Sequence, residues 1–485
     1  AIISQNKKDK VPTYLFSADA EKCFDKLWLK DCIVELENLG FPPIDLEMIY
    51  QLNKEAVVQI KTPIGTTKDI TIEELVRQGT VFGPLFCCAS TAKVNDIGEP
   101  VKQNLGEVEV KMPVFMDDIN STTKDPENIE KAIRNCRRLE IEKKYTFGLT
   151  KTNFMVIDKD DRIMVRVEET LQKGKVKEVE SYKYGGIKIN QDGDLKLHIE
   201  RQKNTSIGIC KELMGLASQR EVGEEFIRVR LQLFEKSYMQ SLLHGLHAWH
   251  ISPEELKRVE QVQSKSLKRI LELPESTPSA ALFLETGIWP ATERILYLTG
   301  MLYQNMIKRS DAIAPKIVKY QEEVHMENSI PHRMEEVLDY IGKSKEDIKR
   351  MQKSDWKKVL KKAMTKKITE RLNNEMRGRT KSRIVIGDPF RRKKYFNKEN
   401  GSLSKEIVKI RMNMYKTKSN YKTKYENLTC PKCHSNKDTT EHVVHCYTGV
   451  AVKELRNEES TSWTKIIEGF QKYTKDLEKE NQNSK

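Results

Sequence analysis

The alternation of apolar and polar residues changes its period along the chain. Residues 13–20, TYLFSADA, form an apolar run that predicts a buried strand ending at an aspartate. Residues 56–72 contain two β-branched runs joined by Thr-Pro-Ile-Gly, which predicts a hairpin. Helical spacing of apolar residues covers three further segments, at 29–39, 44–53 and 125–145.

The later part of the chain is expected to be mostly helical. SYKYGGIKI (181–189) predicts a short strand with a glycine break, and from about residue 196 the spacing is helical almost throughout. Ser252 and Glu255 are placed for a capping box, which predicts that a helix starts there. A further helix is expected around four apolar residues, Trp356, Val359, Leu360 and Ala363. The segment after 465 is polar and is expected to fray. The pattern therefore predicts an α+β fold for the first part and a helical second part.

Composition points to a polyanionic partner. The 485 residues carry a net charge of +14, with 38% hydrophobic and 32% charged residues. Such a basic chain favours nucleic acid first and an anionic membrane surface second, although the charge could also serve only to solvate the surface. No apolar run approaches the ~20 residues that span a bilayer, and no secretory signal is visible. We therefore expect no membrane partner, and the missing initiator Met suggests a piece of a longer protein.

Two adjacent aspartates, Asp117 and Asp118, lie in KMPVFMDDINST. They separate EVEVKMPVF (107–115) from the following residues 119–120, and these two stretches are expected to pair as a hairpin. Aspartate is a common turn residue, so an ordinary turn is one explanation. The flanking residues are apolar, however, and two like charges beside a buried strand are costly unless a cation compensates them. Asp19 ends another apolar strand and could join the pair. Three carboxylates can hold two Mg²⁺ ions roughly 3.5–4 Å apart, an arrangement suited to phosphoryl transfer.

Five sequence motifs in this order resemble those of reverse transcriptases from LINE-type (non-LTR) retrotransposons. They are SADAEKCFDKLWL, RQGTVFGPLF, VFMDDI, FGLTKTNFMVI and YKYGGI. The resemblance implies a right-hand polymerase palm followed by a helical thumb and a small zinc knuckle. It implies an RNA-directed DNA polymerase that extends a DNA primer, or a nicked target DNA end, on an RNA template with deoxynucleoside triphosphates. Its location would be intracellular, and nuclear when it acts on target DNA.

The resemblance also implies roles for individual residues. Asp19 and Asp117 would be the principal Mg²⁺ ligands, with Asp118 the third carboxylate, and Lys151 would protonate the pyrophosphate. Phe24 would exclude a 2′-hydroxyl, although it could instead be a core residue, and Lys151 could be one surface lysine among many. The residues implied around the nucleotide and the primer end are Gln78, Gly79, Tyr184, Gly185 and Gly186.

The chain departs from the family pattern in three ways. Gly83 stands before Pro84 where the family commonly has serine, and Gly185 stands where the primer-grip motif more often has leucine. In addition, only eighteen residues precede Asp19. The fingers segments that contact the triphosphate are therefore expected to be largely missing, and an upstream endonuclease cannot be seen. The alternative function is a catalytically inert nucleic-acid-binding remnant of such a protein. The expected divisions are palm 1–195, thumb 196–325, basic helical connector 326–425, zinc knuckle 426–450 and polar tail 451–485.

Two groups of basic residues are candidates for nucleic-acid contact. The helix expected at 253–273 carries Lys257, Arg258, Lys265, Lys268 and Arg269 on or near one face, where they could meet the phosphates of a template–primer duplex. A charged solvent face is the simpler explanation. FRRKKYF (390–396) could touch RNA or act as an import signal.

Four potential metal ligands gather near the end of the chain. CPKCHSNKDTTEHVVHC contains Cys430, Cys433, His442 and Cys446, with the spacing C-x2-C-x8-H-x3-C. Two cysteines from a tight turn, and a histidine and a cysteine one helical turn apart, can complete a tetrahedral site for one structural Zn²⁺. His434 and His445 are rival ligands. The nine cysteines, with one tight cluster, favour a reducing compartment over a disulfide framework. The segment resembles the CCHC knuckle of LINE-type proteins.

Overall fold

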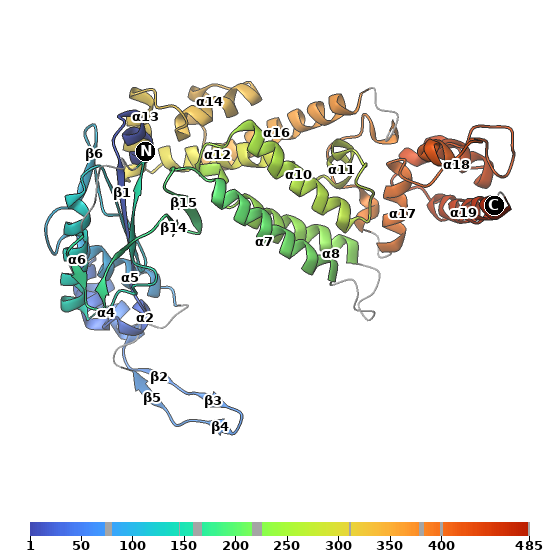
Figure 1. Ribbon diagram of the computed structural model, residues 1–485. Helices are drawn as coiled ribbons and strands as arrows, with labels where there is room; N and C mark the ends of the chain where they lie inside the picture. The colour runs from blue at the N-terminus through green and yellow to red at the C-terminus, as the bar shows by residue number, and fades with distance from the viewer. Residues whose placement is uncertain are drawn as a thin grey trace. The chain divides into compact units, whose positions relative to one another are not determined.

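The computed structural model forms two compact units, drawn together in Figure 1. The first comprises Ala1–Leu197 and Met306–His332, and the second His198–Asn305 and Arg333–Lys485. The residues that the structure describes are 1–72, 80–144, 146–158, 167–215, 226–309, 312–377, 383–397 and 401–483. Among them, no helix combines the length and hydrophobicity needed to cross a bilayer.

The first unit is built on a five-stranded sheet of order β13-β10-β1-β9-β8. The central strand β1 (Thr13–Asp19) pairs antiparallel with β9 (Asp118–Thr123) on one side and with β10 (Asn153–Ile157) on the other. Residues Tyr14 to Ala18 are all buried, because β1 has a neighbour along both edges. The edge strands are β8 (Val114–Phe115) and β13 (Lys177–Glu178), the latter parallel to β10. The strand predicted at 13–20 is confirmed.

Helices pack on this sheet. Helix α6 (Glu127–Lys143) contacts both β1 and β9 through a buried stripe that includes Ile129, Ile133, Cys136 and Leu139. Its apolar residues recur at helical spacing, so the prediction of a helix over 125–145 is confirmed. The other helices of this unit are α1 (Ile2–Lys8), α2 (Cys23–Lys26), α3 (Leu29–Asn38), α4 (Pro43–Asn53), α5 (Gly83–Ala92) and α13 (Ile313–Glu323).

Several two-stranded ribbons extend from the first unit. Residues 56–72 form the predicted hairpin, and Figure 1 shows it projecting away from α2 and α4. The other ribbons differ from the predictions. The residues of EVEV form β7 (Val108–Lys111), which pairs with β6 (Lys102–Leu105) and not across the aspartate turn. SYKYGGIKI is a hairpin of β14 (Ser181–Tyr184) and β15 (Ile187–Asn190), not one broken strand. The remaining short strands are β2 (Ala56–Val58), β3 (Lys61–Thr62), β4 (Gly65–Thr66), β5 (Ile70–Ile72), β11 (Thr170–Leu171) and β12 (Gly174–Lys175).

The second unit is helical in the residues that the structure describes. Helix α10 (Pro253–Ile270) begins with the predicted capping box, in which the Ser252 hydroxyl accepts from the Glu255 amide at 3.3 Å. The other α-helices are α7 (Lys196–Gly215), α8 (Phe226–Leu233), α9 (Met239–Leu243), α11 (Ser279–Thr286), α12 (Ala291–Ile307), α14 (Ile330–Ile341), α15 (Lys345–Arg350), α16 (Lys353–Met376), α17 (Gly401–Arg411), α18 (Thr440–Thr448) and α19 (Trp463–Asn483). A π-helical turn, η2 (Phe234–Tyr238), joins α8 to α9.

Two elements of the second unit differ from the expectation. Helix α16 buries every fourth residue, starting at Trp356 and Leu360, while Val359 and Ala363 are only half-buried. The segment after 465 does not fray: it forms α19, which packs on α18 and buries Phe470 and Tyr473 completely. Its high content of charged residues lies on the opposite face, and that charge obscured the apolar stripe.

Candidate active site and metal centre

The three predicted carboxylates meet at one end of the sheet. Asp19 is the last residue of β1 and lies directly opposite Asp118, the first residue of β9. Asp117 stands in the turn between β8 and β9, and its carbonyl accepts from the Ala20 amide at 3.2 Å. Residues nearly a hundred positions apart in sequence therefore converge, as the sequence predicted. The aspartate pair forms a turn and a carboxylate cluster at once, so the two explanations do not exclude each other.

Helix α5 holds this turn through a side-chain hydrogen bond. Phe115 pairs with Asp118, so Met116 and Asp117 form a two-residue turn, in which Met116 has a φ of 55°. The buried hydroxyl of Thr91 donates to the Met116 carbonyl at 2.6 Å. No sequence pattern marks Thr91, since a threonine on an apolar helix face is equally compatible with simple packing.

The carboxylate cluster carries more negative charge than its one contacting lysine compensates. Burial, followed by the charges of Asp117 and Asp19, raises the pKa of Asp118 above its usual value. Lys151 places its ammonium 3.0 and 3.1 Å from the two carboxylate oxygens of Asp19. This ion pair raises the pKa of Lys151, which is therefore protonated at neutral pH. The site has one lysine in contact with one of its three carboxylates.

The carboxylate set suits a hard divalent cation, because Mg²⁺ prefers one or two carboxylates supplemented by phosphate oxygens and water. Among the described residues, only the Cys430 cluster has all its potential ligand atoms within 4.8 Å of one another. The donor types of the carboxylate set nevertheless fit Mg²⁺, which takes part of its ligands from phosphate and water.

The backbone of Asp19 is hydrogen-bonded to residues of the segment between α6 and β10. The Asp19 amide donates to the buried Thr152 hydroxyl at 3.3 Å, and the Asp19 carbonyl accepts from the Gly148 amide at 3.1 Å. Thr152 directly follows Lys151, so one short segment both orients Asp19 and contacts its carboxylate. Sequence reasoning found Lys151 and missed Thr152.

The predicted primer-end residues lie beside the cluster. Tyr184 ends β14, and the Asp118 charge contributes, after burial, to its raised pKa. Gly185 and Gly186 form the turn to β15 with φ values of 54° and 85°, which glycine adopts without steric cost. Tyr182 donates to the Asn120 side chain at 2.7 Å and so ties this hairpin to β9.

The structure shows less about the other residues that were predicted to lie around the nucleotide. Phe24 is partly buried and packs against the core of the first unit, which is compatible with a core role. Gln78 and Gly79 lie outside the described residues. The substitution of glycine at position 83 is accommodated, because the Thr80 hydroxyl accepts from the Gly83 amide at 3.2 Å at the start of α5.

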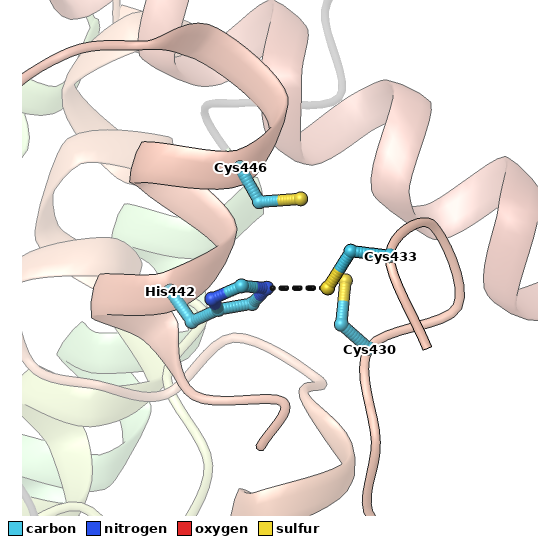
Figure 2. Close-up of side chains that lie close together, drawn as sticks. All are labelled: Cys430, Cys433, His442 and Cys446. Atoms are coloured by element: carbon cyan, nitrogen blue, oxygen red, sulfur yellow. Dashed lines mark hydrogen bonds between the residues drawn. The ribbon is translucent and has the colours of Figure 1, made fainter. Parts of the chain in front are cut away.

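The predicted zinc ligands lie together in the second unit. Figure 2 shows Cys430 and Cys433 on one loop facing His442 and Cys446 on α18. All four ligand atoms lie within 4.8 Å of one another, and the Cys433 sulfur is 3.4 Å from the His442 Nε2. The ligand set contains His442, so neither rival histidine is needed.

Local hydrogen bonds position both the loop and the helix that carry the four potential ligands. The Cys430 amide donates to the Asn436 carbonyl at 2.8 Å and the Cys430 carbonyl accepts from the His434 amide at 2.9 Å, which folds the loop into a tight turn. Thr439 caps α18 by accepting from the His442 amide at 3.1 Å. Hydrogen bonding to Ser435 and Asn436 lowers the pKa of Cys433 to about 5, so this sulfur is available as a thiolate. The donor set fits Zn²⁺.

Comparison with known proteins gives a family match over the N-terminal part of the chain. Residues 2–189 match the family model of reverse transcriptase (RNA-dependent DNA polymerase). These residues form a reverse transcriptase domain. The fold class predicted from the sequence is confirmed: a mixed helix-and-sheet polymerase palm, a helical C-terminal region and a Cys/His cluster.

Solved structures give a distant likeness only. One is telomerase from Candida albicans in complex with the TWJ fragment of telomeric RNA, with a TM-score of 0.27 and 13% identity over 66% of this chain and 53% of that one. Another is telomerase from Candida tropicalis in complex with the same kind of fragment, with a TM-score of 0.30 and 11% identity over 79% of this chain and 50% of that one. The chain spans about half the length of these telomerase chains. No curated protein sequence matches it.

The basic residues C-terminal to the reverse transcriptase domain are only partly available. Lys257, Arg258, Lys265 and Arg269 are exposed on α10. Lys268 is an exception to the prediction: it is buried, and its ammonium donates to the Glu275 carbonyl at 2.9 Å.

The basic run at 390–396 is paired internally. Arg391 binds Glu458 at 2.7 Å, Arg392 binds Glu235, and Lys394 binds Glu459 at 2.8 Å. Lys393 is fully buried and contacts Asp388 at 2.9 Å. Phosphates would have to compete with these carboxylates for the basic side chains of the run.

Proposed function

We propose that this chain is the palm, thumb and zinc-knuckle part of the RNA-directed DNA polymerase of a non-LTR retrotransposon. The observation that carries the proposal is the pairing of Asp19 with Asp118 beside the Asp117 turn, within a reverse transcriptase domain. A DNA primer or a nicked target end would be extended on an RNA template from deoxynucleoside triphosphates, and the reaction on target DNA would take place in the nucleus. Five family motifs in order support the retrotransposon origin.

Asp19, Asp117 and Asp118 would hold two Mg²⁺ ions. When bound, Mg²⁺ lowers the pKa of a hydroxyl nucleophile and stabilises the charge of the transferred phosphates. Lys151 stays protonated because it is paired with Asp19, and it would donate its proton to the leaving pyrophosphate. Phe24 would exclude a 2′-hydroxyl, and Gln78 and Gly79 would contact the incoming nucleotide. Tyr184, Gly185 and Gly186 would hold the primer end.

The Cys430 cluster would hold one structural Zn²⁺. With four protein ligands within reach of one point, the site has no open position for a substrate. Zinc would fix the loop of Cys430 and Cys433 against α18, and thereby organise the surface of the knuckle for nucleic acid.

Primer extension tests this function. The purified chain is given an RNA template, a DNA primer, Mg²⁺ and deoxynucleoside triphosphates, and Asp117→Asn is compared with Asp96→Asn, a matched change at an exposed aspartate outside the cluster. We expect Asp117→Asn to lower the extension rate by at least about 10³-fold, because a metal ligand is lost, and Asp96→Asn to change it less than about twofold. Extension that survives Asp117→Asn would reject the metal role. Absence of extension by the unaltered chain, with nucleic-acid binding retained, favours the inert remnant.

A further inference from the structure

A cavity of about 770 Å³ lies inside the second unit, away from the zinc cluster. Its walls include Trp289 from the loop after α11, Tyr297 and Arg294 from α12, and Lys357 and Lys361 from α16. The volume falls within the range of small-molecule pockets, roughly 300–1,000 Å³. Neither the carboxylate site nor the zinc cluster uses any of these residues.

One wall of the cavity is aromatic. The rings of Trp289 and Tyr297 are 5.3 Å apart and nearly perpendicular, at 74°. Trp289 is partly exposed, and its backbone is fixed because its carbonyl accepts from the Gln263 side chain at 2.8 Å. The Arg294 guanidinium lies 5.4 Å from the centre of the Tyr297 ring. The wall therefore offers an immobilised π face with a cation beside it.

The opposite wall is cationic. Lys357 and Lys361 are exposed and lie one turn apart on α16, so they follow one side of the cavity. Neither they nor Arg294 form an ion pair with any described carboxylate, whereas the neighbouring Lys358 pairs with Asp355 at 3.6 Å. The one lining carboxylate, Glu235, is already paired with Arg392. The cavity thus has an excess of positive charge.

The cavity is built around a glycine. Gly287 has a φ of 63°, and a Cβ at this position would lie 2.1 Å from the Arg392 amide nitrogen. The loop that carries Trp289 can therefore approach the backbone of the 391–392 segment, and this contact brings Trp289 and Phe390 to the same cavity. A larger residue would force the two loops apart.

We propose that this cavity binds one unstacked nucleotide of a single-stranded nucleic acid. An aromatic face stacks on a base of any sequence, and the row of cations fits the phosphates that follow it, a combination typical of single-strand binding. A paired base inside a duplex exposes only its edge, so the cavity selects single strands. The inference rests on the proposed function for its choice of nucleic acid as the ligand, and it adds a site remote in sequence from the catalytic carboxylates.

The test measures binding without catalysis. The full chain carrying Asp117→Asn is titrated, in buffer without Mg²⁺ or chelator, against a fluorescein-labelled 15-nucleotide oligo-dT, oligo-U or a duplex of the same length, with anisotropy as the readout. We expect Trp289→Ala to raise the Kd for both single strands about 10-fold, within the roughly 1–3 kcal/mol of one base–aromatic stack. The duplex Kd should change less than about twofold. The matched control is Lys358→Ala, which should leave both values unchanged.

A second variant covers the case in which Trp289→Ala does not fold, as judged by circular dichroism. Lys357→Ala/Lys361→Ala changes only exposed side chains and should lower the salt dependence of single-strand binding by about 1.4 units of log–log slope, roughly 0.7 for each lysine. Unchanged single-strand binding in folded variants, an equal loss for duplex and single strand, or displacement of the oligonucleotide by equimolar UMP would overturn the proposal. Failure of primer extension leaves this assay untouched, so the two proposals fail separately.

Discussion

Thr91 shows how a side chain remote in sequence from the aspartates positions them. Its hydroxyl donates to the Met116 carbonyl and is also 2.7 Å from the Cys87 carbonyl of its own helix. Replacing it with valine preserves the shape but leaves the turn carbonyl without its donor in a buried position. Turn and helix would then no longer be held together by a hydrogen bond.

We therefore expect Thr91→Val to lower the free energy of unfolding by about 1–3 kcal/mol and to lower the rate of primer extension by more than the stability loss explains. Urea titration and single-turnover extension provide the two measurements. Thr205→Val is the matched control, because the exposed Thr205 hydroxyl bonds only to the Arg201 carbonyl of its own helix at 3.0 Å. Equal effects of the two substitutions would show that Thr91 does not support the turn.

Asp118 predicts a pH dependence of stability. Its pKa is raised in the folded protein by burial and by its two acidic neighbours, so the folded state favours the protonated form. The stability that protonation contributes is present at acidic pH and is lost as the pH rises through the folded pKa. At neutral pH without Mg²⁺, the ionised Asp118 therefore destabilises the domain.

Asp118→Asn is accordingly expected to raise the melting temperature at pH 7 in buffer without Mg²⁺ or chelator and to have a smaller effect at pH 4, while extension is lost. Added Mg²⁺ should raise the melting temperature of the unaltered chain more than that of the variant, since only the former keeps all three carboxylates. Differential scanning fluorimetry with Asp96→Asn as the control measures both effects. A lower melting temperature for Asp118→Asn without Mg²⁺ would contradict this account.

At the scale of elements, the Cys/His cluster joins a loop to a short helix that also packs on α19. Helix α18 has nine residues, and isolated helices of that length are marginal in water. The metal site and the packing of α19 therefore both stabilise α18. Tyr473 on α19 links the two by donating to Asp438 at 2.5 Å, just before the Thr439 cap.

Removal of zinc should therefore unfold the knuckle and loosen α19 while leaving the palm intact. We expect a strong chelator, or Cys446→Ser, to increase amide hydrogen exchange in 428–483 and to leave exchange in β1 and β9 unchanged. Cys88→Ser removes a partly buried thiol outside the cluster and serves as the control. A native zinc content near zero by elemental analysis would reject the site itself.

For the whole molecule, the net charge of +14 overstates the charge available to nucleic acid. The run at 390–396 is paired with carboxylates, and Lys268 is buried, while Lys265 is exposed on α10. Only cations that are not already paired release counterions from phosphates. For nucleic-acid binding, the question of which basic residues are ion-paired therefore matters more than the net charge of the chain.

Two lysines make this distinction measurable. Lys265→Ala should reduce the slope of log Kd against log salt for a template–primer duplex by about one. Lys394→Ala, which removes a lysine paired with Glu459, should leave the slope unchanged. Equal slopes for the two variants would show that internal pairing does not decide which lysines contact the duplex.

The sequence predicted the strand at Asp19, the helix at 125–145 and the capping box at Ser252 because each depends on neighbours within a few positions. It also predicted the cysteine cluster, whose ligands lie within seventeen residues of one another. It erred at α19, because charge counted along the chain does not show which face of a helix is buried. For the same reason it did not show that the basic residues of 390–396 are paired with carboxylates. The sequence also did not show which strands pair with each other. The residues of EVEV alternate in the same way whether they pair with β6 or with β9.

The sequence by itself determined the chemical inventory of this protein, namely three carboxylates at strand ends, four soft metal ligands at metal-binding spacing and an excess of basic residues. Local periodicity located several of the elements, among them β1, α6 and the start of α10. Only the tertiary structure decided that Asp19 faces Asp118, that Thr91 secures their turn and that Trp289 and Lys357 border one cavity. These contacts join residues about 25 to 100 positions apart, and pairing at such distances depends on sheet register and packing, which no local pattern encodes.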